Sequence, residues 1–135
     1  MMDRSRQPIM RADPRSKAAP SDSSIVSKAA LRAAAKLHVT NRALARIIGV
    51  SEATVSRMGK GEYPLEPETK SFELAVLFVR LYRSLNAITG GDEGVAGAWL
   101  TNPNLALPGR PLELIQSVSG LTNVIQYLDT RRAVV

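Results

Sequence analysis

Apolar residues recur at steps of three and four along most of the chain after about residue 22, and this spacing predicts amphipathic helices. The first predicted helix begins near Ser23 or Ser24, because serine is a favoured N-cap residue. Its apolar stripe consists of Ile25, Val26, Ala29, Ala30, Ala33, Ala34 and Leu37. His38 follows, and we interpret it as a helix-end residue, with a ligand role as the alternative. No segment alternates apolar and polar residues as a strand does, so the predicted fold is all-α.

Two short helices are predicted next, with a glycine between them. The second helix starts after Thr40 or Asn41 and runs to about Ile48. Gly49 is expected to end it as a left-handed cap, since glycine adopts that conformation without steric cost. The third helix covers roughly residues 52–58 and follows Ser51, which serves as its cap.

The longest predicted helix extends from about Glu68 to Ile88, with Pro67 in its first turn. Its stripe consists of Phe72, Ala75, Val76, Val79, Tyr82 and Leu85, widened by Leu77, Phe78 and Leu81. A stripe this wide can serve two surfaces, so the range 72–88 is the candidate contact with a second subunit; the alternative is burial against the C-terminal unit. Three short helices are predicted after Gly91, with starts at Asp92, at Pro111, and at Ser119 or Gly120.

Residues 44–58 have the spacing of a helix-turn-helix. Ala45 is the small residue that lets the two helices cross closely, and Gly49 stands four positions later at the turn. Apolar residues fill the positions expected to be buried around the crossing, namely Leu44, Ile48, Val50, Val55 and Met58. The alternative is a helical hairpin that merely packs.

The outward positions of this segment suit DNA, because the second helix of such a motif lies in the major groove. Glu52 is expected to accept a hydrogen bond from cytosine N4, and Arg57 to donate to guanine or to a phosphate. Hydroxyl groups and further cations would contact base edges or phosphates. The candidate DNA-contacting residues are Arg42, Arg46, Ser51, Glu52, Thr54, Ser56, Arg57 and Lys60.

Charge supports this interpretation. The 135 residues carry 18 Lys and Arg against 12 acids, a net charge of +6. Residues 1–60 hold 12 of the basic residues and 4 acids, a net of +8, whereas residues 61–135 hold 6 basic residues and 8 acids, a net of −2. Such an asymmetry favours an anionic partner for the N-terminal half and a different task for the other half.

Composition excludes several classes of function. Cysteine is absent and there is one histidine, which argues against disulfides, thiolate chemistry and metal sites, so no cofactor, metal or enzymatic activity is predicted. No apolar run approaches the ~20 residues of a membrane span, and no apolar stretch follows the basic N-terminus as in a secretory signal. We therefore expect a soluble, cytoplasmic protein whose partners do not include a membrane.

The C-terminal residues resemble a known family. Trp99-Leu100, then Pro103-Asn104, Leu107, Gly109, the run 111–115 (PLELI) and the later Gly120 form a pattern similar to the toxin-binding domain of Xre/MbcA/ParS-type antitoxins. The helix-turn-helix ahead of it is similar to the Xre-like domain of the same antitoxins, and the resemblance covers about residues 25–130.

The resemblance implies a type II toxin–antitoxin pair. The toxin partner would be a RES-domain protein that consumes NAD. The antitoxin would form a homodimer and a higher hetero-oligomer with the toxin. It would cover the toxin's active site with its C-terminal end and repress its own operon by binding operator DNA. Arg131 and Arg132 would suit a pocket for the phosphates of NAD; the alternative is a frayed helix end with solvated arginines. The candidate toxin-binding residues are Trp99, Arg110, Tyr127, Arg131, Arg132, Val134 and Val135.

Together these patterns predict four regions: a disordered basic arm (1–22), a helix-turn-helix domain (23–66), a long connecting and dimerisation helix (67–91) and a toxin-binding domain (92–135). About 45 residues rarely build a stable core alone, so the last region is expected to dock on the long helix, a second subunit or a partner. The alternative function is a stand-alone dimeric transcriptional regulator without a toxin.

Overall fold

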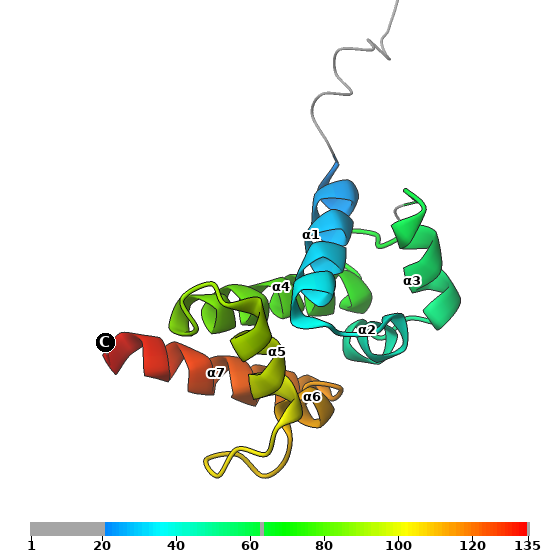
Figure 1. Cartoon of the computed structure of the whole chain (residues 1–135). Coiled ribbons are helices and arrows are strands. Elements are labelled where there is room, and N and C mark those ends of the chain that lie inside the picture. The colour runs from blue at the N-terminus through cyan, green and yellow to red at the C-terminus, as the bar shows by residue number, and fades with distance from the viewer. Residues whose placement is uncertain (1–20, 63, 135) are drawn as a thin grey trace, which may run out of the picture.

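The computed structural model describes residues 21–62 and 64–134, and within these ranges every regular element is an α-helix (Figure 1). The seven helices there are α1 (Asp22–Leu37), α2 (Asn41–Ile48), α3 (Glu52–Gly59), α4 (Lys70–Ile88), α5 (Glu93–Thr101), α6 (Pro111–Leu114) and α7 (Val118–Val134). The predicted all-α fold is confirmed. The predicted basic arm falls largely on residues 1–20, which lie outside the described residues.

The N-terminal turn of α1 differs from the sequence prediction. Its N-cap is Ser21, whose hydroxyl accepts a hydrogen bond from the Ser24 N–H at 3.1 Å, so the helix begins earlier than predicted. Its C-cap is His38, which adopts a left-handed φ of 59° and donates its N–H to the end of the helix. His38 is therefore a helix-end residue, as one of its two interpretations expected.

The face that α1 buries is also rotated from the predicted stripe. Ser24 and Ser27 are buried beside Ala30, whereas Ile25 is 50% exposed. The buried positions 24, 27, 30, 34 and 37 follow one another at steps of three and four along one face of α1, which packs against α4 and α5. The first two residues of this face are small and polar. The apolar residues at the start of the predicted stripe lie beside this face and stay partly open.

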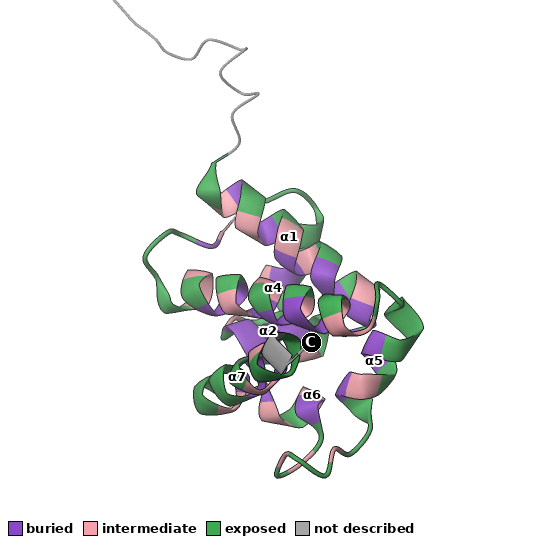
Figure 2. Cartoon of the chain, turned by 90° about the vertical axis from the view of Figure 1, so that its left-hand side faces the viewer, coloured by how far each residue is buried: buried purple, intermediate pink, exposed green. Residues whose placement is uncertain are grey.

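Helix α4 occupies the centre of the molecule and contacts α1, α2, α5 and α7 (Figure 1). Thr69 is its N-cap, so Pro67 and Glu68 precede the helix and the predicted start at Glu68 was wrong. The buried face of α4 is apolar at Phe78, Leu81 and Leu85, and Ser84 is its one buried polar residue. Figure 2 shows buried positions between the helices and exposed positions on their outer sides.

The C-terminal part packs on α4 through a long helix rather than a short one. Helix α7 has 17 residues and begins at Val118, and the Ser117 hydroxyl accepts the Gly120 N–H at 3.1 Å. The prediction of a short last helix starting at Ser119 or Gly120 was wrong. Gly120, one of the two predicted starts, lies inside the first turn of α7.

Gly120 is required for the close approach of α6 and α7. A Cβ built on it would overlap the Leu114 carbonyl oxygen and come within 2.8 Å of the Ser117 hydroxyl. Such crowding cannot be relieved by a side-chain rotation, because the nearest atoms belong to the backbone at the end of α6.

We therefore expect Gly120→Ala to lower the free energy of unfolding, although alanine is the better helix former by ~1 kcal/mol. Overpacking costs ~1–3 kcal/mol and outweighs that gain when backbone must move. Chemical denaturation measures the change. The matched control is Gly59→Ala, since a Cβ at Gly59 meets no atom within 4 Å. Equal effects of the two substitutions would contradict this account of Gly120.

Candidate functional site

Helices α2 and α3 cross as a helix-turn-helix. Gly49 ends α2 in a left-handed conformation with φ 76°, and the N–H groups of Gly49 and Val50 both donate to the Ala45 carbonyl, at 2.9 and 3.0 Å. Ala45 is buried at the crossing, as predicted. The apolar positions around it are also buried, namely Leu44, Ile48, Val55 and Met58, while Val50 is half-buried. The predicted motif is therefore present in its predicted register.

The candidate DNA-contacting residues are all at least partly exposed. Those that are exposed are Arg42, Arg46, Ser51, Glu52, Ser56, Arg57 and Lys60, and Thr54 is half-buried. Arg42 and Arg46 are one turn apart on α2, Ser51 to Arg57 belong to the cap and body of α3, and Lys60 follows α3 directly.

Two of the hydroxyl groups already have partners within α3. The Ser51 hydroxyl accepts the Thr54 N–H at 3.0 Å, which makes Ser51 the N-cap of α3. The Ser51 and Thr54 hydroxyls are also 2.9 Å apart and hydrogen-bonded to each other. Glu52, Ser56 and Arg57 are exposed on α3 and take no part in these cap hydrogen bonds.

Arg57 has an intramolecular partner that the sequence analysis missed. Its Nε lies 3.5 Å from Oε1 of Glu62, and the two side chains are 48% and 60% exposed. An ion pair this open contributes little to stability, so a phosphate or a guanine edge can replace the carboxylate at small cost. The sequence shows that a carboxylate follows Arg57 by five residues. The two side chains come close, however, only because the chain turns after α3.

Three of the predicted toxin-binding residues form a stack between α5 and α7. The rings of Trp99 and Tyr127 are parallel to within 18°, with centroids 6.3 Å apart. The Arg131 guanidinium lies 5.7 Å from the Tyr127 ring centroid and donates to the Tyr127 hydroxyl at 2.8 Å. Trp99 and Tyr127 are half-buried and Arg131 is exposed, so the stack begins against the core and ends at the surface.

The other predicted toxin-binding residues are not part of this stack. Arg110 is exposed at the N-terminal end of α6. Val134 ends α7, and Val135 lies outside the described residues. Arg132 points toward α4 instead and donates to the Ser84 hydroxyl at 3.2 Å. The two adjacent arginines therefore serve different contacts.

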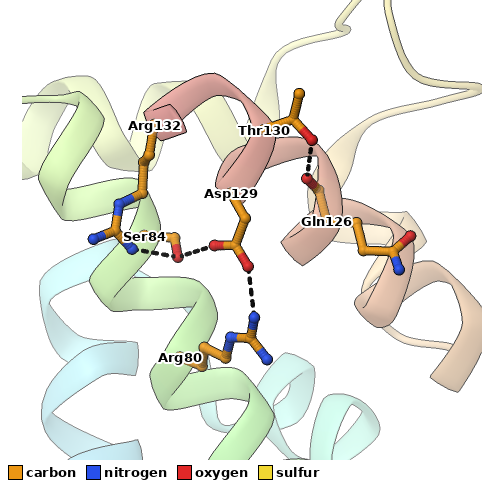
Figure 3. Close-up of polar contacts among 6 residues, drawn as sticks. All are labelled: Arg80, Ser84, Gln126, Asp129, Thr130 and Arg132. Carbon is orange, nitrogen blue, oxygen red and sulfur yellow. Dashed lines mark hydrogen bonds and ion pairs between the residues drawn. The ribbon is translucent and has the colours of Figure 1, made fainter. Parts of the chain in front are cut away.

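Arg132 belongs to a polar cluster that joins α7 to α4 (Figure 3). The Ser84 hydroxyl is buried and donates to Oδ1 of Asp129 at 2.8 Å, while Arg80 donates to Oδ2 at 2.6 Å. The Ser84 hydrogen bond, the Arg80 hydrogen bond and the charges of Arg80 and Arg132 hold the pKa of Asp129 below its ordinary value, against the opposing effect of burial. The sequence did not predict the contacts among Arg80, Ser84 and Asp129. The one feature that could have indicated them is the serine at position 84, within the apolar stripe of the helix.

Two kinds of structural feature are absent from residues 21–62 and 64–134. No helix there is long and apolar enough to span a membrane. No group of three or more His, Asp or Glu side chains in the same ranges is placed to hold a metal ion.

The helix-turn-helix with outward cations, joined to a helical unit with an aromatic and cationic surface, defines a DNA-binding protein with a second binding unit. Residues 17–80 match the antitoxin Xre-like helix-turn-helix domain, and residues 84–133 match the antitoxin Xre/MbcA/ParS C-terminal toxin-binding domain. The chain therefore belongs to the Xre-type antitoxins, and the predicted resemblance is confirmed. One matched domain is a helix-turn-helix and the other is a toxin-binding domain. No curated protein was found to match the chain.

We expect Arg57→Ala to weaken binding to a selected DNA site about tenfold or more, because one base contact supplies ~1–3 kcal/mol of discrimination. Random DNA of equal length should lose far less, since it is bound through phosphates. Binding isotherms on both DNAs measure the ratio. Lys70→Ala, at the start of α4, is the control cation. Equal loss on both DNAs would make Arg57 a phosphate contact.

The Asp129 cluster predicts a pH-dependent stability. Because the pKa of folded Asp129 is lowered, its contribution is complete above about pH 4, the ordinary aspartate pKa, and is lost as pH falls through the lowered value. Asp129→Asn should therefore lower Tm at pH 7, and the difference from wild type should shrink below about pH 4. Thermal melts across this range test it, with the exposed Glu113→Gln as control. A difference that persists at low pH would count against the cluster.

Proposed function

We propose that this antitoxin neutralises a RES-domain, NAD-consuming toxin by covering the toxin's active site with the C-terminal end of α7. We further propose that it acts as a homodimer that represses its own operon. Two binding units on one chain support this proposal, since residues 17–80 and 84–133 match a DNA-binding and a toxin-binding domain of antitoxins.

The main support for the proposed toxin contact is the stack of Trp99, Tyr127 and Arg131. Arg131 has a guanidinium with five N–H donors, and the stack uses one of them on the Tyr127 hydroxyl. The remaining donors are held at the surface by a base of two aromatic rings, so little side-chain entropy is lost when they bind. A planar, oriented guanidinium suits the phosphates that an NAD-consuming pocket recognises.

Arg132 has a supporting role in this proposal. Its contact with Ser84 and the ion pair of Asp129 with Arg80 fix the last turns of α7 on α4. The direction in which Arg131 projects then follows from the packing of α7. Arg110, Val134 and Val135 are also proposed as toxin contacts.

Operator binding supplies the second part of the proposal. One recognition helix reads few base pairs, so two copies related by a two-fold axis would read two half-sites one DNA turn apart. The exposed cations on α2 and after α3, namely Arg42, Arg46 and Lys60, would contact phosphates while α3 reads bases. The proposed arm of residues 1–22 would add phosphate contacts. Such a protein works in the cytoplasm, at the nucleoid.

Removal of the α7 end tests the toxin contact. In cells that co-express the toxin, a chain lacking residues 131–135 should fail to protect growth and cellular NAD. Arg131→Ala alone should weaken the toxin complex about tenfold or more, in the range of a charge-assisted hydrogen bond, with little change in Tm. Gln126→Ala, an exposed substitution on the same helix, is the control.

Two outcomes would contradict this proposal. Full neutralisation by the truncated chain would remove the α7 end from the toxin contact. A tagged pull-down from the native cell that returned only DNA and the antitoxin chain would favour the alternative, a stand-alone dimeric transcriptional regulator. A stoichiometric partner that is lethal alone and depletes NAD would support the RES assignment.

A further inference from the structure

An apolar groove lies between α1 and α4 and has no occupant within the described chain. Its walls are Ile25, Val26 and Ala29 from α1 and Val76 and Val79 from α4, and it encloses about 350 Å³. A second depression of about 330 Å³ continues it along α4, beside Phe72 and Leu77, and shares Val76 with the first. The two form one apolar surface, which we call the α1–α4 groove.

The groove exposes large apolar side chains at its centre. Val76 is 43% exposed and Ile25 is 50% exposed, although each follows a buried residue, Ala75 and Ser24 respectively. These residues belong to the predicted stripes of α1 and α4 that the fold leaves partly open. Burial of such side chains on association would be favourable, because it removes apolar area from water.

Charges on the outer face of α4 are arranged asymmetrically about this groove. Glu73 lies toward the N-terminal end of the face and Arg83 toward the C-terminal end, ten positions apart or ~15 Å along the helix. Neither has an ion-pair partner among the residues that the structure describes, whereas Arg80 is paired with Asp129. The face therefore carries an unpaired anion at one end and an unpaired cation at the other.

We propose that the α1–α4 groove binds the same groove of a second copy, with the two α4 helices antiparallel about a two-fold axis at the level of Phe78. Glu73 and Arg83 are each five positions from Phe78, so the axis places Glu73 of each chain opposite Arg83 of the other. Val76 and Val79 lie within two positions of the axis and supply its apolar contacts. Arg80 is also two positions from the axis, where its charge stays paired with Asp129. This inference rests on the homodimer of the proposed function and gives it an interface.

Charge also sets the direction of the pairing. A parallel pairing of two α4 helices is disfavoured, because it would place Glu73 beside Glu73 and Arg83 beside Arg83.

The first test is the oligomeric state of the full chain without toxin or DNA. Wild type should sediment as a dimer at micromolar concentration, and Val76→Asp should sediment as a monomer with an unchanged helical circular dichroism spectrum. The matched control is Val118→Asp, because Val118 is 51% exposed on α7, away from the groove. It should remain dimeric.

A charge exchange tests the register without placing a charge in the apolar centre. Glu73→Arg and Arg83→Glu should each raise the dimer dissociation constant at least tenfold, and the double variant should return it to within about threefold of wild type. Both positions are exposed, so both variants should fold. A double variant that dissociates as readily as the singles would overturn the antiparallel register.

These outcomes separate the interface from the proposed function. A dimeric Val76→Asp variant would overturn the α1–α4 interface while leaving the homodimer in place. A monomeric wild type would overturn both the interface and the homodimer. Toxin binding by monomeric Val76→Asp, measured by co-purification, should be retained, since the Trp99 stack lies between α5 and α7.

Discussion

Burial of the inner face of α4 is the constraint on which the rest of the structure depends. Phe78, Leu81 and Leu85 are fully buried, and the helix that carries them contacts α1 and α2 as well as α7. The buried apolar residues form one cluster that extends from Ala30 to Leu128. The C-terminal helices therefore obtain their core from α4, which explains how so short a segment presents an ordered surface.

Local rules allowed much of the fold to be predicted from the sequence. The cap at Gly49, the crossing at Ala45 and the cap at Ser51 depend on a few neighbouring residues, and all three were found as expected. The buried face of α1 depends instead on how α1 packs against α4. Ser24 and Ser27 are buried there because of tertiary contact, which hydrophobic periodicity cannot indicate.

In the candidate sites, too, some residues could be assigned from a local pattern and others depend on tertiary packing. Polar residues on α3 could be assigned to the outer face from the helical period alone. Arg131 and Arg132 were indistinguishable in the sequence, yet one stacks on Tyr127 and the other contacts Ser84. Arg80 and Asp129 are 49 positions apart, so their ion pair requires α7 to lie along α4 before it can form. No local pattern encodes that arrangement.

One shared core also links the two binding units energetically. A ligand that binds only the folded state stabilises that state by RT ln(1 + [L]/Kd), wherever on the folded unit it binds. DNA at α3 and a protein at α7 would act on the same cluster, because α4 packs against both parts of the chain. Degradation that proceeds from the unfolded chain is slowed by the factor 1 + [L]/Kd, because the unfolded population falls by that factor. Either partner would therefore protect the whole antitoxin, including the surface that binds the other partner.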